Sequence, residues 1–347
     1  MGNGAAGMER IHLRSDMHDF RRNDYDVTNS VQVSSSAAVC AAVREMFVTI
    51  WPREAFDRVE QAFADFDALF SGRMPGYCGV DTVYHDRQHT LDMTLAMMRL
   101  LAGYERSNEE PARFGGERAV LALVASLFHD AGYIREVTDT RHRNGAEFTL
   151  YHVARSAQFL AKYLPQLRLQ AWIPVATRIV HFTGYEVPFD QIHLDDRRDR
   201  KAGHLLGTAD LIAQMADRCY LEKCRDRLYP EFVLGGIATA SGTGGKVQVR
   251  YGSGLDVLRQ TPHFVQIART ERLEAAFEHA YRFIEPLFGG RNPYMEAIDR
   301  NMIYLDRVLR SQRWPLLRRK PPLFTTHSDE MHQVRGLMVD HLRAVWA

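Results

Sequence analysis

The feature that most constrains the fold is an apolar run from Leu121 to Phe128 that ends in an adjacent histidine and aspartate, His129 and Asp130. A helix as apolar as this is buried on most of its faces, so it carries both polar side chains into the protein interior. An unpartnered charge in that position strongly destabilises a fold. His129 and Asp130 therefore need partners, which are either ordinary backbone and capping contacts or a bound metal ion.

Other histidines and aspartates along the chain offer such partners. Each of these residues lies on or beside a segment with helical spacing. The residues are His85, His89, His152, His181 and Asp210. Neutral imidazoles and carboxylates are the ligands that hard or borderline divalent cations prefer. The sequence therefore indicates a metal site, and a purely structural role for each histidine stays open as the alternative.

The spacing of the polar residues predicts where they lie on helices. His85 and His89 are four residues apart, so both imidazoles are expected on one helix face, with Asp92 placed to orient one of them. The central helix is expected over residues 117–130, and Gly132 after it allows a left-handed turn. Further helices carry His152, His181 and Asp210, and they are expected over residues 152–163, 172–181 and 204–224.

The order His89, then His129-Asp130, then Asp210 is similar to the H…HD…D signature of the HD-domain metal-dependent phosphohydrolases. The segment YHDRQH at residues 84–89 also resembles the YHNxxH motif of class I cyclic nucleotide phosphodiesterases, a related all-helical group. The segments HVARSA, Ile-Val-His and Thr-Ala-Asp-Leu, which contain His152, His181 and Asp210, lie where small HD hydrolases carry similar elements. The resemblance covers residues 75–232.

This resemblance implies an all-α fold, an HD-domain or phosphodiesterase-like helical bundle with a small irregular or hairpin excursion. It also implies a metal-dependent phosphohydrolase that uses a metal-activated water on a nucleotide, cyclic nucleotide or other small phosphate ester. One divalent ion (Mn, Mg, Zn, Co or Fe) would be held by His89, His129, Asp130 and Asp210. A second ion would add His152 and His181, with Asp130 as the bridge between the two.

Three further residues have roles in this interpretation. His85 matches the first histidine of the phosphodiesterase motif and would be the general acid beside the catalytic Asp130. Residues 134–150 are expected to form a loop over the metal site, where Arg135 and Arg143 could bind substrate phosphate, because guanidinium groups match phosphate oxygens. A mobile, solvated loop is the alternative for these arginines.

The chain departs from the phosphodiesterase pattern at two positions. Tyr133 stands where those enzymes have another histidine, and Asp86 stands where they have asparagine, so a broader phosphohydrolase function is favoured over cyclic nucleotide specificity. Two other functions remain open. One is a diiron HD-fold oxygenase with the same ligand set, and the other is a non-catalytic, metal-stabilised helical interaction module.

The length of 347 residues allows one large domain or two small ones, and 46% hydrophobic residues can fill a sizeable core. Four parts are expected along the chain. Residues 1–30 would be a flexible arm, 31–232 the catalytic domain with its N-terminal helical buttress, 233–262 a Gly-rich excursion, and 263–347 helices that pack on the core. The amphipathic piece from Met331 to Trp346 could dock on the body or on a second subunit of a homodimer.

The charge balance bears on partners. Lys and Arg number 44 against 43 Asp and Glu, so the charge gives no argument for nucleic acid or a membrane as the main partner. The small phosphorylated substrate, a nucleotide, is what the resemblance implies. The four cysteines show neither a zinc-like pair nor the density of a disulfide framework. No apolar run of signal-peptide or membrane-spanning length occurs, so a reduced, cytoplasmic setting is expected.

Overall fold

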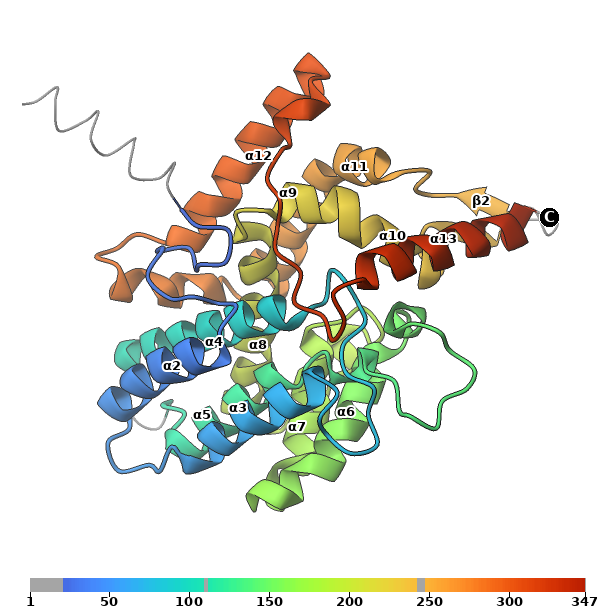
Figure 1. Cartoon of the computed structure of the whole chain (residues 1–347). Coiled ribbons are helices and arrows are strands. Elements are labelled where there is room, and N and C mark those ends of the chain that lie inside the picture. Colours follow the sequence, from blue (N-terminus) through green and yellow to red (C-terminus); the bar gives the residue numbers. More distant parts are fainter. Residues whose placement is uncertain (1–20, 109–111, 242–246, 347) are drawn as a thin grey trace, which may run out of the picture.

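A computed structural model describes residues 21–108, 112–241 and 247–346 and shows an all-α protein with one short hairpin (Figure 1). The predicted fold class is confirmed. The α-helices are α2 (Ser36–Ile50), α3 (Asp57–Phe70), α4 (Arg87–Ser107), α5 (Gly116–Leu127), α6 (His152–Tyr163), α7 (Ile173–Ile179), α8 (Arg197–Ala216), α9 (Tyr220–Lys223), α10 (Tyr229–Leu234), α11 (Gly254–Ile267), α12 (Pro293–Ser311) and α13 (Glu330–Trp346).

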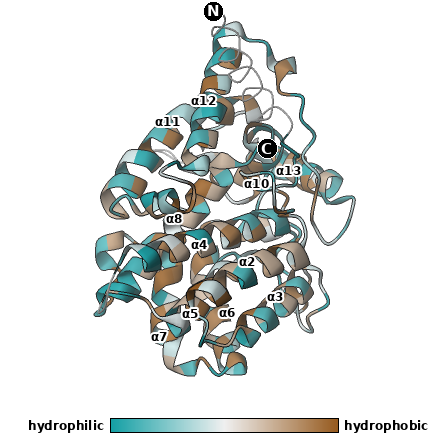
Figure 2. Ribbon diagram, turned by 90° about the vertical axis from the view of Figure 1, so that its left-hand side faces the viewer, coloured by the Kyte–Doolittle hydropathy of each residue, from teal (hydrophilic) through white to brown (hydrophobic). Residues whose placement is uncertain are grey.

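Helices α4 and α8 pack against each other at the centre, with α2 and α5 also against α4. Figure 2 shows that the apolar sides of these helices turn toward the interior of the molecule. The helix α5 is buried along its whole length, as its apolar composition predicts. These central helices carry polar groups into the interior. The N-terminal end of α4 and the C-terminal end of α5 come together in that interior.

Two helix boundaries differ from the prediction in a way that matters for the site. The helix α5 ends at Leu127, so His129 and Asp130 lie in the turn that follows it. The helix α4 begins at Arg87, because the Asp86 side chain accepts a hydrogen bond from the His89 amide (3.1 Å) and caps the first turn. His85 therefore precedes the helix. The spacing predicts that His85 and His89 share a helix face, and the structure shows that they do not.

Gly132 also differs from the prediction. It does not adopt the left-handed conformation and belongs to η1 (Ala131–Tyr133), a 3₁₀ turn. Its role is the close approach of α6, because a Cβ at this position would lie 1.8 Å from the carbonyl oxygen of His152. Only glycine allows the turn with His129 and Asp130 to lie against the start of α6.

The described part of the predicted flexible arm, residues 21–30, is in contact with the rest of the protein. Residues 21–30 pack on the body, where the fully buried Asp26 accepts a hydrogen bond from Arg99 of α4 at 2.6 Å. The Arg99 guanidinium contributes to a pKa of about 2 for Asp26, although burial alone would raise it. The rest of the predicted arm, residues 1–20, lies outside the described residues.

The Gly-rich excursion contains an antiparallel pair, β1 (Thr239–Ser241) and β2 (Val247–Val249), with Ala240 opposite Gln248. The predicted hairpin is confirmed for these strands, while residues 242–246 between them lie outside the described part. Helix α11 already begins at Gly254, so the excursion ends before the predicted residue 262.

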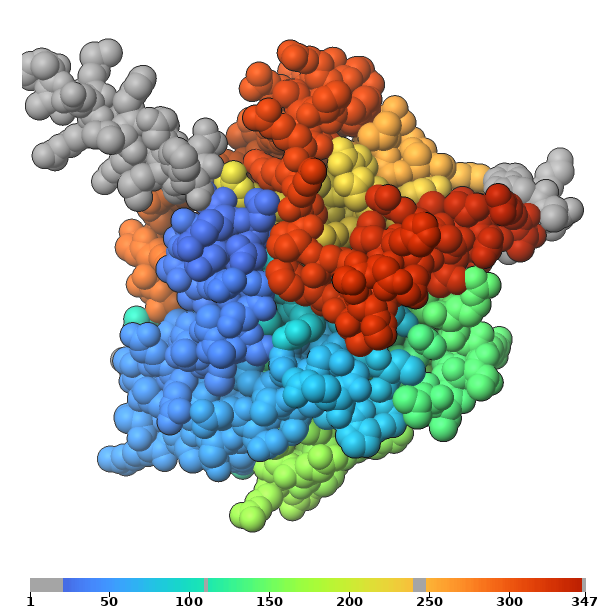
Figure 3. Space-filling view, viewed as in Figure 1, coloured from blue at the N-terminus to red at the C-terminus, as the bar shows by residue number. Residues whose placement is uncertain are grey.

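The C-terminal segment runs back over the body and ends in α13, which lies across the face seen in Figure 3. Helix α13 packs on α10. Val334 of α13 is fully buried in a small apolar cluster with Val83 and Leu234. The C-terminal helix therefore covers the loop that precedes His85. Among the described residues, no helix is long and apolar enough to cross a membrane.

Replacing Gly132 with Ala is expected to destabilise the fold by about 3 kcal/mol, the upper end of the cost of overpacking, because the new methyl group meets backbone of α6. Gly336→Ala is the control, since a Cβ there meets no atom within 4 Å. It should leave stability unchanged or raise it slightly. Thermal unfolding followed by circular dichroism measures both, and equal stabilities would contradict the close-approach argument.

Candidate metal centre

Three buried side chains from α4 and the turn after α5 bring their ligand atoms together. One ligand atom each of His89, His129 and Asp130 lies within 4.8 Å of the other two, an arrangement that could hold a metal ion. The His129 Nε2 atom is 3.1 Å from Asp130 Oδ2, and His89 Nε2 is 3.6 Å from the same oxygen. The sequence brought these three residues forward as ligands, and the structure places them side by side.

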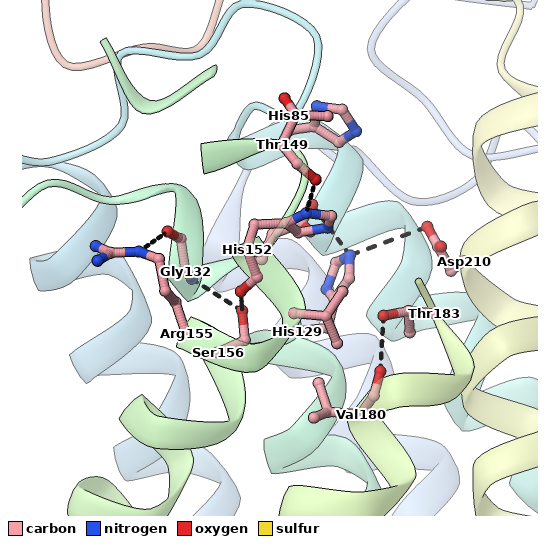
Figure 4. Close-up of polar contacts among 12 residues, drawn as sticks. His85, His129, Gly132, Thr149, His152, Arg155, Ser156, Val180, Thr183 and Asp210 are labelled. Atoms are coloured by element: carbon pink, nitrogen blue, oxygen red, sulfur yellow. Dashed lines mark hydrogen bonds and ion pairs between the residues drawn. The ribbon is translucent and has the colours of Figure 1, made fainter. Parts of the chain in front are cut away.

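Asp210 reaches the same cluster from α8. Its Oδ1 atom is 3.2 Å from His89 Nε2 and 3.9 Å from His129 Nε2 (Figure 4 shows His129 and Asp210 facing each other). Gln214, one turn further along α8, donates to that oxygen at 3.3 Å and so orients the carboxylate. All four predicted principal ligands therefore lie in one buried place.

The hydrogen bonds around His129 leave ligand atoms free. Its Nδ1 atom is 2.9 Å from the Ser126 carbonyl oxygen and donates a hydrogen bond to it, so Nε2 is the atom that faces Asp130 and that would bind a metal ion after losing its proton. His129 Nε2 and Asp130 Oδ2 are both buried without a hydrogen-bond partner among the described residues, despite their short separation. Buried polar atoms are normally satisfied, and a divalent cation between them would satisfy both. The donor set thus fits a metal ion.

The electrostatics of the cluster favour a cation. Burial alone would raise the pKa of Asp130, but the imidazoles of His129, His85 and His89 hold it well below its usual range. Burial would lower the pKa of His129, and the Asp130 carboxylate raises it. Asp130 is therefore an ionised carboxylate at neutral pH, the form that binds metal.

His152, at the first position of α6, faces the other oxygen of Asp130. Its Nε2 atom is 3.8 Å from Asp130 Oδ1, while its Nδ1 atom is 2.8 Å from the Thr149 carbonyl oxygen. Burial lowers the pKa of His152 to about 4, so the imidazole is neutral and its Nε2 lone pair is available. His152 thus stands at the edge of the cluster as the sequence predicted.

His181 is less closely associated with the other predicted ligands. It lies in η5 (Val180–Phe182), half-buried, and its Nδ1 atom has no hydrogen-bond partner among the described residues. Within the described residues, His181 forms no ion pair with Asp130 or Asp210. Burial lowers the pKa of His181, which keeps the imidazole neutral.

The turn that holds Asp130 is fastened to α6 by side chains of that helix. The Gly132 amide donates to Ser156 Oγ at 2.8 Å, and Arg155 donates to the carbonyl oxygens of Gly132 (2.7 Å) and Ile134 (3.1 Å) (Figure 4). Glu186 accepts hydrogen bonds from the amides of residues 153 and 154, which caps the start of α6. These contacts fix His152 relative to Asp130.

His85 forms a pair that the sequence did not indicate. Its Nδ1 atom is 2.6 Å from Oε2 of the buried Glu231, and the other oxygen of Glu231 accepts from the amides of Val83 and Tyr84. Burial alone would lower the pKa of His85, but the Glu231 carboxylate contributes to raising it to about 9. The His85 imidazole is therefore protonated at neutral pH.

Tyr133, which the sequence marked only as a departure from a family pattern, packs against two histidine rings. Its ring stacks on His85 with centroids 4.6 Å apart and on His152 with centroids 4.2 Å apart. The stack places the protonated His85 beside the cluster without direct contact to the Asp130 carboxylate. The sequence offered a signal for Tyr133, because it lies four residues after His129 in the motif, but none for Glu231.

The two arginines expected to bind phosphate are engaged elsewhere. Arg135 donates to Asp81 at 2.9 Å. This hydrogen bond connects the loop that follows the turn with His129 and Asp130 to the segment before α4. Arg143 lies 3.4 Å from Asp340 of α13, and its side chain is 62% exposed. Among the described residues, neither arginine contacts the candidate metal cluster. Their role in substrate binding therefore stays a prediction.

Comparisons with known proteins give one match. The family model described as Npun_R2479-like matches residues 139–266. No curated protein and no solved structure matches the chain. The matched part contains His152, His181 and Asp210 but begins after His89, His129 and Asp130, so it covers only one side of the metal cluster.

Replacing Asp130 with Asn is expected to abolish metal uptake, because it removes the charge that faces His89, His129 and His152 while keeping the side-chain shape. Metal content after loading and desalting, measured by elemental analysis, tests this. Asp190→Asn, at an exposed position, is the control and should load like the wild type. Unchanged metal content in Asp130→Asn, with an unchanged circular dichroism spectrum, would rule out the site.

Proposed function

We propose that the protein is a metal-dependent phosphohydrolase acting on a nucleotide or another small phosphate ester. The observation that carries the proposal is geometric: His85, paired with the buried Glu231 at 2.6 Å, lies beside a buried cluster of side chains that could hold a metal ion. Hydrolysis of a phosphate ester needs both parts, because the attacking water must be activated and the leaving oxygen must receive a proton. The resemblance to HD-domain phosphohydrolases in the order of the motifs points the same way.

His89, His129, Asp130 and Asp210 would hold the ion. A bound divalent cation supplies Lewis acidity and lowers the pKa of a coordinated water. The two carboxylates balance the charge of one dication, which would keep the ion bound while an anionic substrate is still tolerated beside it. Manganese, magnesium, zinc, cobalt and iron all accept such a mixed set of nitrogen and oxygen donors.

The geometry of Asp130 supports a second ion. Its Oδ2 atom faces His89 and His129, whereas its Oδ1 atom faces His152 at 3.8 Å. A carboxylate with ligand imidazoles on both oxygens is suited to bridge two ions, which stand about 3.5–4 Å apart in two-metal sites. His181 would be the additional ligand on the His152 side.

His85 would protonate the leaving oxygen. Its Nδ1 proton is held by Glu231, so the proton on Nε2 is the one that can be transferred. Stacking on Tyr133 fixes the ring plane, which keeps the donor aligned during the reaction. Glu231 is itself oriented by two backbone amides and cannot follow the histidine if it turns away.

We also infer a reduced, cytoplasmic setting for this chemistry. The four cysteines, Cys40, Cys78, Cys219 and Cys224, are free, and two of them are buried. Free thiols are typical of proteins in a reducing compartment.

The proposal is tested by elemental analysis of the purified protein together with a phosphate-release screen over nucleotides, cyclic nucleotides and simple phosphate esters. Phosphate release that requires manganese, magnesium, zinc or cobalt supports the hydrolase. Iron with a charge-transfer absorption and oxygen consumption would instead indicate a diiron oxygenase. Absence of bound metal, with no release after metal addition, would indicate a non-catalytic helical module.

His85→Ala is expected to retain its metal and to lose rate by on the order of 10²–10⁴-fold on an alkyl phosphate ester, because the leaving alkoxide is no longer protonated. An aryl ester with a good leaving group should lose much less. Steady-state kinetics on both esters measures the difference. Equal losses on the two esters, or loss of metal, would show that His85 is not the acid.

The pH dependence follows from the pKa of His85, about 9, which lies above the ordinary value for histidine. The acid is present below that pH and is lost above it, so kcat is expected to fall on the alkaline side near pH 9. Glu231→Gln removes the carboxylate that raises this pKa and should move the alkaline limb to lower pH. Glu60→Gln, with a side chain 56% exposed, is the control. An unmoved limb in Glu231→Gln would contradict the assignment.

A further inference from the structure

One buried arginine differs from the others in the described part of the chain. Arginines buried there generally form an ion pair with a carboxylate, at 2.6 Å for Arg99 with Asp26, 2.6 Å for Arg118 with Asp199 and 3.3 Å for Arg227 with Asp86. Arg272 is 5% exposed and forms no ion pair with any described residue. An unpaired buried charge is costly, so its retention points to a partner that is not part of the chain.

The contacts of Arg272 leave one donor group unused. It lies in η9 (Ala268–Ala276), a π-helical segment, and its Nη2 atom donates to the Gly184 carbonyl oxygen. The guanidinium carbon lies 3.9 Å from the ring centroid of Tyr185 and 4.7 Å from that of Phe189. The Nη1 atom is buried, and no described residue offers it a hydrogen-bond acceptor. The arginine is thus fixed by aromatic rings on its faces while an N–H group stays available.

The position of Arg272 relates it to the metal cluster. Gly184, which anchors it, packs against Val153 next to His152, since a Cβ on Gly184 would lie 2.5 Å from a Val153 methyl group. Thr183, the preceding residue, lies on the Asp210 side of the centre (Figure 4). Burial lowers the pKa of Arg272, and the Tyr185 hydroxyl and the Asp210 carboxylate offset part of this. The guanidinium therefore lies within electrostatic reach of a metal ligand.

The ring above Arg272 is placed to cover it. Tyr185 is 70% exposed although the guanidinium beneath it is almost completely buried. An exposed aromatic ring can change rotamer without disturbing the core, and that movement would open the Nη1 atom to solvent. A planar guanidinium binds two oxygens of a phosphate or carboxylate group at once, which suits it to anion recognition.

We propose that Arg272 is the residue that recognises an oxyanion group of the substrate, and that Tyr185 covers it until the substrate binds. This inference rests on the proposed function for the identity of the substrate, a phosphate ester, and it adds the residue that selects for the negative charge. The shared chemistry is that of a tetrahedral or planar oxyanion, so inorganic phosphate is a suitable probe.

The test measures binding of inorganic phosphate to the full-length, metal-loaded protein by isothermal titration calorimetry, so it does not depend on hydrolysis. Arg272→Gln is expected to weaken phosphate binding about tenfold or more, because a hydrogen-bonded charged partner is lost. Arg269→Gln is the matched control, since Arg269 lies in the same segment, pairs with Asp299 and has a side chain 34% exposed. Its affinity should stay within threefold of the wild type.

A loss of less than threefold in Arg272→Gln, or an equal loss in both variants, would overturn the proposal. If Arg272→Gln does not fold, Tyr185→Ala decides, because it removes only an exposed ring. In that variant an arginine-specific dicarbonyl reagent should label Arg272, and phosphate should slow the labelling at least threefold, as followed by mass spectrometry. Labelling at the same rate with and without phosphate would overturn the proposal. Phosphate binding that depends on Arg272 without any ester hydrolysis would leave this inference standing and remove the proposed function.

Discussion

The contact between the turn after α5 and the first residues of α6 is the constraint on which the metal centre depends. At Gly132 the two segments are so close that no side chain fits between them. The approach is fixed by a hydrogen bond from the Gly132 amide to Ser156 and by one from Arg155 to the Gly132 carbonyl oxygen. This contact places the two oxygens of Asp130 toward different imidazoles. The backbone contact therefore sets how the two oxygens of Asp130 are presented to the surrounding histidines.

Charge is arranged around this contact in a consistent way. Asp130 stays ionised and His152 stays neutral, and both states favour a bound cation. His85 pairs with Glu231 and stacks on the Tyr133 ring, and it forms no ion pair with Asp130 among the described residues. The cluster thus brings groups suited to a cation close to a histidine that has its own carboxylate partner.

The sequence predicted the helical fold, and it singled out the residues that the fold gathers into the buried cluster, because both depend on local patterns. The helix over residues 152–163 was predicted to the residue, since its apolar spacing and length are unambiguous. The position of His85 was not, because a single capping aspartate moved the start of α4 beyond it. Glu231 could not be found, since it meets His85 across 146 positions of sequence and follows no motif. Arg272 was equally hidden among many arginines, and only its missing carboxylate distinguishes it.

Helix α13 covers the loop before His85, and it is the last helix of the chain to be synthesised. The four residues of the buried cluster lie between residues 89 and 210, whereas Glu231 follows them and the apolar cover from Val334 comes later still. During synthesis from the N-terminus, the residues of the cluster emerge first, the partner of His85 second and the cover last. The order of residues along the chain therefore makes the cluster available for assembly before His85 can pair with Glu231 and before the covering helix exists.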